Sequence, residues 1–167
     1  MINQRSTILN KTQIEQKIKR IAYQIYEANS SEKEIVLAGI LKNGFILTQK
    51  LAEVLAEICN IELRLCEVFI DKKSPINSVS SSLLANEYKD KALVLIDDVL
   101  NSGTTLIYGV KHFLNVPLSR FKTAVLVDRS HKKYPVKADF KGISLSTSIK
   151  EQVVVEFNSS GAVAYLR

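Results

Sequence analysis

The stretch Leu93–Thr105, L-V-L-I-D-D-V-L-N-S-G-T-T, carries the strongest signals for both fold and function. Its first four residues are apolar and rich in branched side chains, which predicts a buried strand. Asp97 and Asp98 stand where that strand is expected to end. A small polar turn, 101–105, then leads into the helix-like run 106–114. We therefore expect a strand, a carboxylate pair, a turn and a helix in direct succession.

This succession suits a ligand that carries both hydroxyl groups and a phosphate. Ligands of open α/β sheets bind at the carboxyl ends of parallel strands. A turn of small residues before a helix presents free backbone N–H groups and the positive end of the helix dipole, which favour a phosphate. Two carboxylates beside it favour ligand hydroxyls or a shared cation, so a sugar phosphate fits best. The alternative is an ordinary strand, an Asx-type turn and a capped helix without a ligand.

The composition is that of a globular protein, with 167 residues, 46% apolar and 24% charged. We expect a single domain over residues 1–167 in the cytoplasm, with no secretory signal and no apolar run long enough for a membrane. Cys59 and Cys66 form no disulfide framework, and two histidines make a transition-metal site unexpected. The net charge of +6 fits an anionic substrate and also weak attraction to nucleic acid.

Strand and helix patterns alternate along the rest of the chain. Apolar periodicity predicts, in chain order, a helix 12–29, a strand 35–40, a helix 45–60, a strand 61–70, a strand 121–127, a strand 140–145, and a hairpin that pairs 152–157 with 162–166. Thr12 and Glu15 have the spacing of a capping box for the first helix. This order predicts an α/β fold: a twisted parallel sheet with helices on both faces and a small antiparallel hairpin.

Each long helix is expected to bury one face. The inward residues of the first helix are Ile14, Ile18, Ile21, Ala22 and Ile25. Those of the second helix are Phe45, Thr48, Leu51, Ala52 and Leu55. The lysines on the opposite side of the first helix form a solvated face, which we favour over a nucleic-acid contact.

Two further loops stand at the expected carboxyl edge of the sheet. The turn 39–44 joins a strand to a helix through glycines, which is a weak phosphate-site signal by itself. The stretch 71–86 is polar and is expected to be irregular, and a long loop in a small domain is usually functional or disordered. Lys72 and Lys73 in it either reach a bound anion or are simply solvated. The sequence leaves those two alternatives open.

The central stretch resembles the phosphoribosyl pyrophosphate (PRPP) motif of the type I phosphoribosyltransferases: four apolar residues, two acidic residues, then V-x-x-T/S-G-x-T. The resemblance implies that Asp97 and Asp98 hold the ribose hydroxyls and act in catalysis by placing negative charge near the developing sugar cation. It implies that the 5′-phosphate binds to the loop of Val99, Leu100, Asn101, Ser102, Gly103, Thr104 and Thr105. It further implies pyrophosphate binding by Lys42 and Asn43, and a mobile lid about residues 70–88.

The second half sharpens this resemblance. V-L-V-D-R-S-H-K-K-Y-P-V-K-A-D-F, residues 125–140, is similar to a segment of the pyrimidine-operon attenuator/uracil phosphoribosyltransferase family. Members use PRPP with Mg²⁺, held mainly through PRPP rather than by protein ligands, and many both make UMP from uracil and bind messenger RNA. The resemblance implies a base pocket beside Val127, Asp128 and Arg129, and a homo-oligomer, a dimer or tetramer. For His131 a structural role is favoured.

Three functions remain after this comparison of motifs: a phosphoribosyltransferase for uracil or a similar base, an RNA-binding regulator, and a PRPP-binding protein with little turnover. The lid lacks the Y-R-D-D signature of relatives, and Thr104 replaces a common arginine. Lys19 and Tyr23 stand where RNA-binding relatives favour threonine and histidine, which weakens the regulator hypothesis. The intact central motif favours the enzyme.

Overall fold

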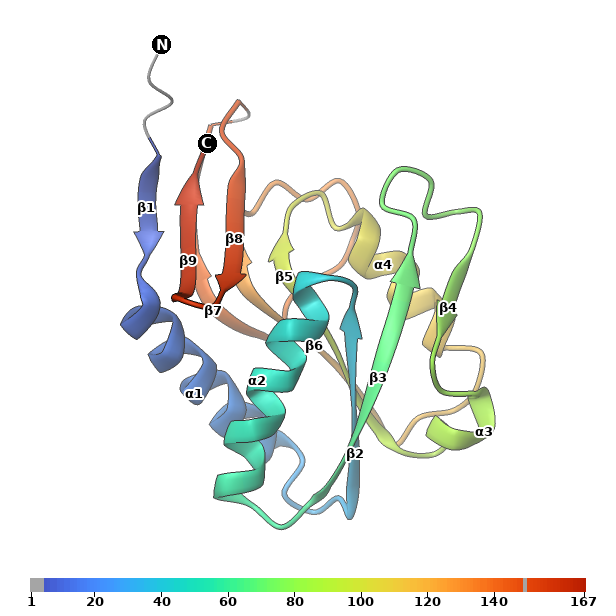
Figure 1. Ribbon diagram of the computed structural model, residues 1–167. Helices are drawn as coiled ribbons and strands as arrows, with labels where there is room; N and C mark the ends of the chain where they lie inside the picture. Colours follow the sequence, from blue (N-terminus) through green and yellow to red (C-terminus); the bar gives the residue numbers. More distant parts are fainter. Residues whose placement is uncertain (1–4, 149) are drawn as a thin grey trace.

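A mixed sheet with the strand order β4-β3-β2-β5-β6-β7 forms the centre of the molecule (Figure 1). The computed structural model describes residues 5–148 and 150–167. Strands β3, β2, β5, β6 and β7 are parallel, and β4 joins the edge of β3 antiparallel. Their bounds are β2 Glu34–Ile40, β3 Glu62–Ile70, β4 Val79–Ser81, β5 Ala92–Leu100, β6 Arg120–Asp128 and β7 Phe140–Ser144.

Helices cover both faces of this sheet, which confirms the predicted α/β architecture. The helices are α1 Lys11–Ala28, α2 Asn43–Ile58, α3 Ala85–Tyr88 and α4 Thr104–Phe113. Successive residues of β2 alternate between two cores: Leu37 packs with α1 and α2, whereas Val36 packs with α3 and α4. Because both faces are covered, the central strands read as continuous apolar runs.

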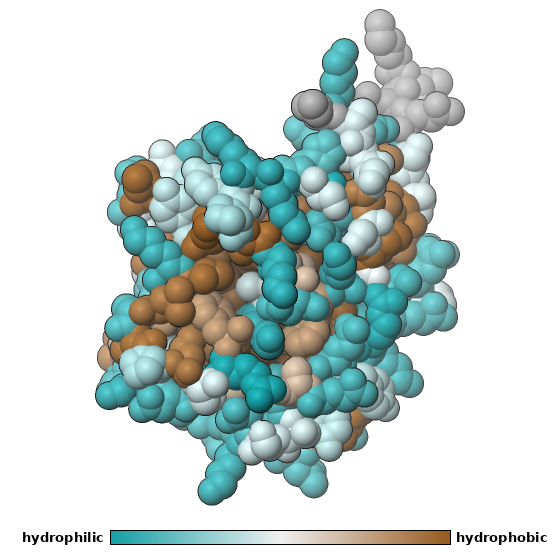
Figure 2. All heavy atoms as spheres, turned by 180° about the vertical axis from the view of Figure 1, so that it is seen from behind, coloured by the Kyte–Doolittle hydropathy of each residue, from teal (hydrophilic) through white to brown (hydrophobic). Residues whose placement is uncertain are grey.

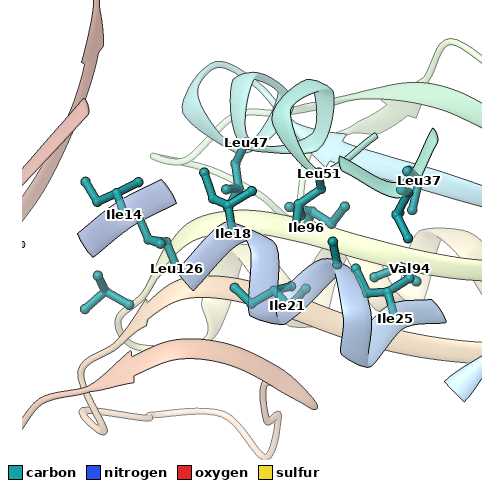
Figure 3. Packing of buried hydrophobic residues seen from close by; sticks show 14 of the residues in the cluster. Ile14, Ile18, Ile21, Ile25, Leu37, Leu47, Leu51, Val94, Ile96 and Leu126 are labelled. Carbon is teal, nitrogen blue, oxygen red and sulfur yellow. The ribbon is translucent and has the colours of Figure 1, made fainter. Parts of the chain in front are cut away.

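The core under α1 forms as the helical periodicity predicted, whereas the buried face of α2 differs from the prediction in part. The five expected inward residues of α1 are all buried. Figure 3 shows Ile14, Ile18, Ile21 and Ile25 of α1 in one packed cluster with Leu47 and Leu51 of α2. In α2, Leu47 is fully buried, although it was not predicted to face inward, whereas Phe45 and Ala52 are only partly buried. Helix α2 begins at Asn43, two residues earlier than expected, and its buried residues are Gly44, Leu47, Thr48, Leu51 and Leu55.

The predicted cap of α1 was wrong. Asn10, not Thr12, caps the helix: its Oδ1 accepts from the Gln13 N–H and its own N–H donates to Gln13 Oε1, each at 2.9 Å. Both pairs have capping-box spacing, but Asn10 has the extended backbone that a cap requires because it follows strand β1 directly. Thr12 and Glu15 therefore lie exposed in the first turns.

A second, three-stranded sheet stands beside the carboxyl ends of the parallel strands (Figure 1). It has the order β1-β9-β8, with β1 Ser6–Leu9, β8 Val153–Asn158 and β9 Gly161–Leu166. The predicted hairpin is β8 and β9. Strand β1 was not predicted, because its four residues pair only with β9, at the other end of the chain.

The stretch between β3 and β5 is more ordered than predicted. Residues 79–81 form β4 and residues 85–88 form α3, so 71–86 is not irregular throughout. Tyr88 of α3 is buried and its ring lies 5.0 Å from that of Phe113 in an edge-on arrangement. This aromatic contact fixes α3 against α4, a long-range effect that local polarity did not reveal.

Candidate active site

The two carboxylates of the central stretch are buried at the carboxyl end of β5. Asp97 is 3% exposed and Asp98 is 9% exposed. The strand was predicted to end at this pair. It instead runs on to Leu100, because Val99 and Leu100 still pair with β6. Asp97 Oδ1 accepts the Asp98 N–H at 2.9 Å and lies 3.8 Å from the Lys72 ammonium.

This environment changes the acidity of Asp97. Burial is the main cause and the neighbouring Asp98 carboxylate the second; together they raise the pKa of Asp97 to about 8, against the opposing effect of Lys72. Two adjacent carboxylates with one partly exposed lysine nearby favour a ligand that brings positive charge or hydroxyl donors. A cation or a polyhydroxylated ligand would therefore offset the unfavourable burial of these adjacent carboxylates.

A tight turn connects these carboxylates to helix α4. Gly103 has φ +82°, and a Cβ there would also meet Val136 Cγ1 at 2.6 Å, so the position requires glycine. Helix α4 begins at Thr104, two residues before the predicted start, and leaves its first N–H groups at the cavity. Ser102 Oγ and Thr104 Oγ1 lie 2.9 Å apart and add hydroxyl groups to the same surface. These groups are the expected donors to a phosphate.

The start of α2 supplies the side chain that links the carboxylates to the small sheet. Asn43 Nδ2 donates to Asp98 Oδ2 at 3.0 Å and to the carbonyl oxygen of Val155 in β8 at 2.8 Å. Lys42 is exposed and does not line the cavity. The structure thus brings Asn43, but not the Lys42 side chain, next to the two carboxylates.

These groups surround one cavity of about 250 Å³. Its wall consists of Asn43, Lys72, Val125, the run 97–106, and Val153, Val154 and Val155. Every residue of the predicted phosphate loop, 99–105, is among them. The β8 valines were missed, because nothing in the sequence shows that a late hairpin folds over the end of β5. Lys72 is brought to the cavity, which favours the first of its two open alternatives, whereas Lys73 is exposed.

Val127, Asp128 and Arg129 lie at the end of β6, next to the loop but outside the lining of this cavity. Asp128 is buried, and its carboxylate accepts the Ser130 N–H and lies 3.4 Å from the Lys141 ammonium. The Arg129 side chain is buried and its donors are directed to Asn101 and to residues 147, 148 and 151. His131 Nε2 lies 2.7 Å from the Thr147 carbonyl oxygen, which agrees with a structural role.

A second hollow lies on the far side of the lid stretch. Residues 75–79 and the α4 side chains Tyr108, Lys111 and His112, with Asn115, line it. Figure 2 shows hydrophobic atoms gathered on this side of the molecule, where β4, α3 and α4 lie in Figure 1. Ile76, Leu84 and Leu114 are among the exposed large apolar side chains.

Comparison with known proteins identifies the class. The model of the phosphoribosyl transferase domain matches residues 4–159. The chain therefore belongs to the phosphoribosyltransferase family, and it is a pentosyltransferase, as the central motif predicted.

Within this family, the chain is similar to proteins of known name. The bifunctional protein PyrR of Streptococcus gordonii is 34% identical over 149 residues, which cover 86% of this chain and 85% of the relative. The PyrR protein of Bacillus pumilus is 31% identical over 169 residues, 94% of this chain and 93% of the relative. A crystal structure of the hypoxanthine phosphoribosyltransferase of Trypanosoma cruzi superposes with a TM-score of 0.80 at 17% identity, covering 98% of this chain and 84% of that one, and so shares the fold.

None of the helices in the described part of the chain is long and apolar enough to cross a membrane. The cytoplasmic location stays a prediction.

Proposed function

We propose that this protein transfers the phosphoribosyl group of PRPP to uracil, giving UMP and pyrophosphate. The observation that supports this proposal most directly is that the carboxylate pair of β5 and the turn into α4 line one cavity together with Asn43. The choice of uracil is supported by the segment 125–140, which resembles uracil phosphoribosyltransferases, and by the similarity to PyrR proteins. A purine base is the competing substrate, because fold neighbours such as the Trypanosoma cruzi enzyme act on hypoxanthine.

In this proposal each wall of the cavity binds one part of PRPP. The loop 99–105 and the start of α4 bind the 5′-phosphate through backbone N–H groups and hydroxyls. When PRPP binds, Asp97 releases the proton that it holds in the free protein. Asp97 and Asp98 then accept hydrogen bonds from the ribose hydroxyls, and their negative charge lies near the sugar carbon that becomes cation-like. The pyrophosphate lies at the start of α2, near Lys42 and Asn43, with Lys72 approaching from the lid stretch.

The reaction then needs no protein nucleophile. A ring nitrogen of the base forms the new bond to the anomeric carbon, the bond to the pyrophosphate oxygen breaks with its electron pair leaving on pyrophosphate, and the proton of the base passes to water. The base lies beside Val127, Asp128 and Arg129, where backbone groups read its edge. The oxygen-rich donor set of the cavity fits Mg²⁺. The described residues hold no cluster of three His, Cys, Asp or Glu, so Mg²⁺ would be held mainly by PRPP oxygens and by water. When bound, Mg²⁺ neutralises charge on the leaving pyrophosphate.

Product formation from PRPP, Mg²⁺ and a panel of free bases tests the proposal. UMP formed with uracil alone supports it, and a purine nucleotide formed instead contradicts the choice of base. Asp97→Asn should lower kcat/KM for PRPP by about tenfold or more, or about 1.4 kcal/mol of transition-state stabilisation. Asp90→Asn is the matched control, because Asp90 is exposed at the opposite end of β5 and should not affect kinetics. Unchanged kinetics in Asp97→Asn would remove this carboxylate from the mechanism.

The alternative is a nucleotide-sensing regulator that binds messenger RNA. Two observations favour keeping it: the similarity to proteins described as bifunctional, and the net charge of +6. RNA affinity that falls steeply with salt would support the regulator, because each neutralised phosphate releases a counterion. Tight PRPP binding without any product would indicate a sensor with little turnover. The predicted dimer or tetramer is checked by sedimentation analysis.

A further inference from the structure

Arg129 is a buried cation that no carboxylate neutralises at contact distance among the described residues. Its side chain follows β6 and is 7% exposed. Nη1 donates to Asn101 Oδ1 at 2.9 Å, while Nε and Nη2 donate to Thr147 Oγ1 at 3.1 and 3.0 Å. Nη2 also donates to the carbonyl oxygens of Ser148 and Glu151. All of these hydrogen-bond acceptors are uncharged. The Glu151 carboxylate is near enough that, after the hydrogen bonds from Ser148, the Arg129 charge also lowers the Glu151 pKa, but it makes no salt bridge with Arg129 among the described residues.

These bonds join two walls of the cavity. Asn101 belongs to the loop between β5 and α4, on the predicted phosphate side. The acceptors at 147, 148 and 151 lie in the segment that leads into β8, whose valines form the opposite wall. The Arg129 backbone adds a third tie, because its N–H donates to the carbonyl oxygen of Leu100 at 3.0 Å.

We propose that Arg129 is a positioning residue for the phosphate loop and not a side-chain contact to the base. The planar guanidinium holds Asn101 at a fixed distance from the segment before β8, and its charge adds positive potential behind the loop, where Thr104 supplies none. This inference rests on the proposed function, because the loop matters only if it receives the 5′-phosphate. Lysine cannot replace Arg129, since an ammonium has three donors at one point and cannot span both partners.

Two variants separate the charge from the bridge. Arg129→Lys keeps the charge and loses the bridge, and it should raise the KM for PRPP by about tenfold, with the KM for uracil and kcat changed by less than about threefold. Thr147→Val keeps Arg129 and removes its side-chain acceptor on the far side while the Ser148 and Glu151 carbonyl oxygens remain, and it should raise the KM for PRPP by about threefold. Arg120→Lys, at the other end of β6, is the matched control with unchanged KM.

A double variant tests whether Arg129 acts through Asn101. If it does, Asn101→Ala and Arg129→Lys together should raise the KM for PRPP no more than the larger single effect, because both remove the same link. Additive effects overturn the proposal. A raised KM for the base with an unchanged KM for PRPP also overturns it, because that result makes Arg129 a base contact.

A measurement without ligand keeps this test independent of the proposed function. In ¹⁵N NMR spectra of the free protein, the side-chain amide signal of Asn101 should shift in Arg129→Lys and in Thr147→Val, but not in Arg120→Lys. An Asn101 signal that stays in place in both variants overturns the bridge. If the wild type forms no product and binds no PRPP, the proposed function fails, while the NMR result still decides whether Arg129 holds the loop.

Discussion

At the scale of single residues, the site is dominated by a carboxyl group in an unfavourable place. Asp97 is almost completely buried next to Asp98, with Lys72 at 3.8 Å as its nearest counter-charge. Burial and the second carboxylate raise its pKa to about 8, so the free protein holds this group protonated at neutral pH. A ligand or cation that binds the Asp97 carboxylate must therefore displace this proton.

The raised pKa predicts a specific dependence of stability on pH. Between the ordinary carboxyl pKa and about 8, the unfolded chain has released this proton while the folded chain retains it, so stability falls as pH rises through that window. In Asp97→Asn the decline from this group is absent. The variant should therefore gain at least about 1.4 kcal/mol relative to wild type between about pH 5.5 and about pH 8.5, measured by urea unfolding.

The difference between the two proteins is the informative quantity, because titrations of all other groups are shared. A difference that stays constant with pH would show that Asp97 titrates normally. Asp90→Asn again serves as the control, since that carboxylate is exposed.

At the scale of elements, the start of α2 is held unusually close to β5. A Cβ at Gly44 would lie 2.8 Å from the carbonyl oxygen of Ile96 and 3.0 Å from the Asp97 Cα. Both neighbours are backbone atoms, which cannot move aside as a flexible side chain does. This approach brings Asn43, the preceding residue, within hydrogen-bonding distance of Asp98.

Gly44→Ala should therefore displace α2 from β5 despite the higher helix propensity of alanine. We expect a loss of about 2 kcal/mol in the free energy of unfolding, as for other overpacked cores, together with a raised KM for PRPP. Chemical unfolding and steady-state kinetics measure the two effects. Glu53→Ala on the exposed side of α2 is the control and should change stability by less than about 0.5 kcal/mol. A more stable Gly44→Ala protein would show that the close approach is not required.

At the scale of the whole molecule, the cavity lies between the carboxyl edge of the large sheet and two smaller segments of the chain. The hairpin of β8 and β9 covers one side, and the stretch between β3 and β4 approaches from the other through Lys72. Residues 71–78 contain neither helix nor strand, and most of them are exposed. This stretch is a part of the predicted lid, about 70–88, without helix or strand, and we expect it to be the part that moves.

Closure of the lid is tested by limited proteolysis, because Lys72 and Lys73 are trypsin sites within it. PRPP with Mg²⁺ should slow cleavage after these lysines by about tenfold or more, since an ordered lid opens less often. Cleavage after Lys33, which is exposed in a turn at the other end of β2, should not change. Equal rates at all three lysines with and without ligand would contradict a closing lid.

The amino-acid sequence by itself determined the α/β class, the inward face of α1 and the position of the central stretch at a strand end. These features depend on local patterns: apolar periodicity, and a carboxylate pair followed by a glycine turn within thirteen consecutive residues. The residues predicted to form the phosphate loop, 99–105, all line the cavity, and their binding of a phosphate stays a prediction. Element ends were less accurate, as the true cap at Asn10 and the extension of β5 to Leu100 show.

Only the tertiary structure decided which distant residues complete the site. The cavity brings Lys72, Asn43 and the β8 valines next to Asp97 and Asp98. This meeting depends on the order of strands in the sheet and on the β8–β9 hairpin folding over the end of β5, and local sequence spacing encodes neither of these. The same holds for Arg129, whose bridge from Asn101 to residue 147 joins segments far apart in the chain. Short-range patterns specify an element because its neighbours are covalently fixed, whereas contacts across the molecule depend on how all elements pack together.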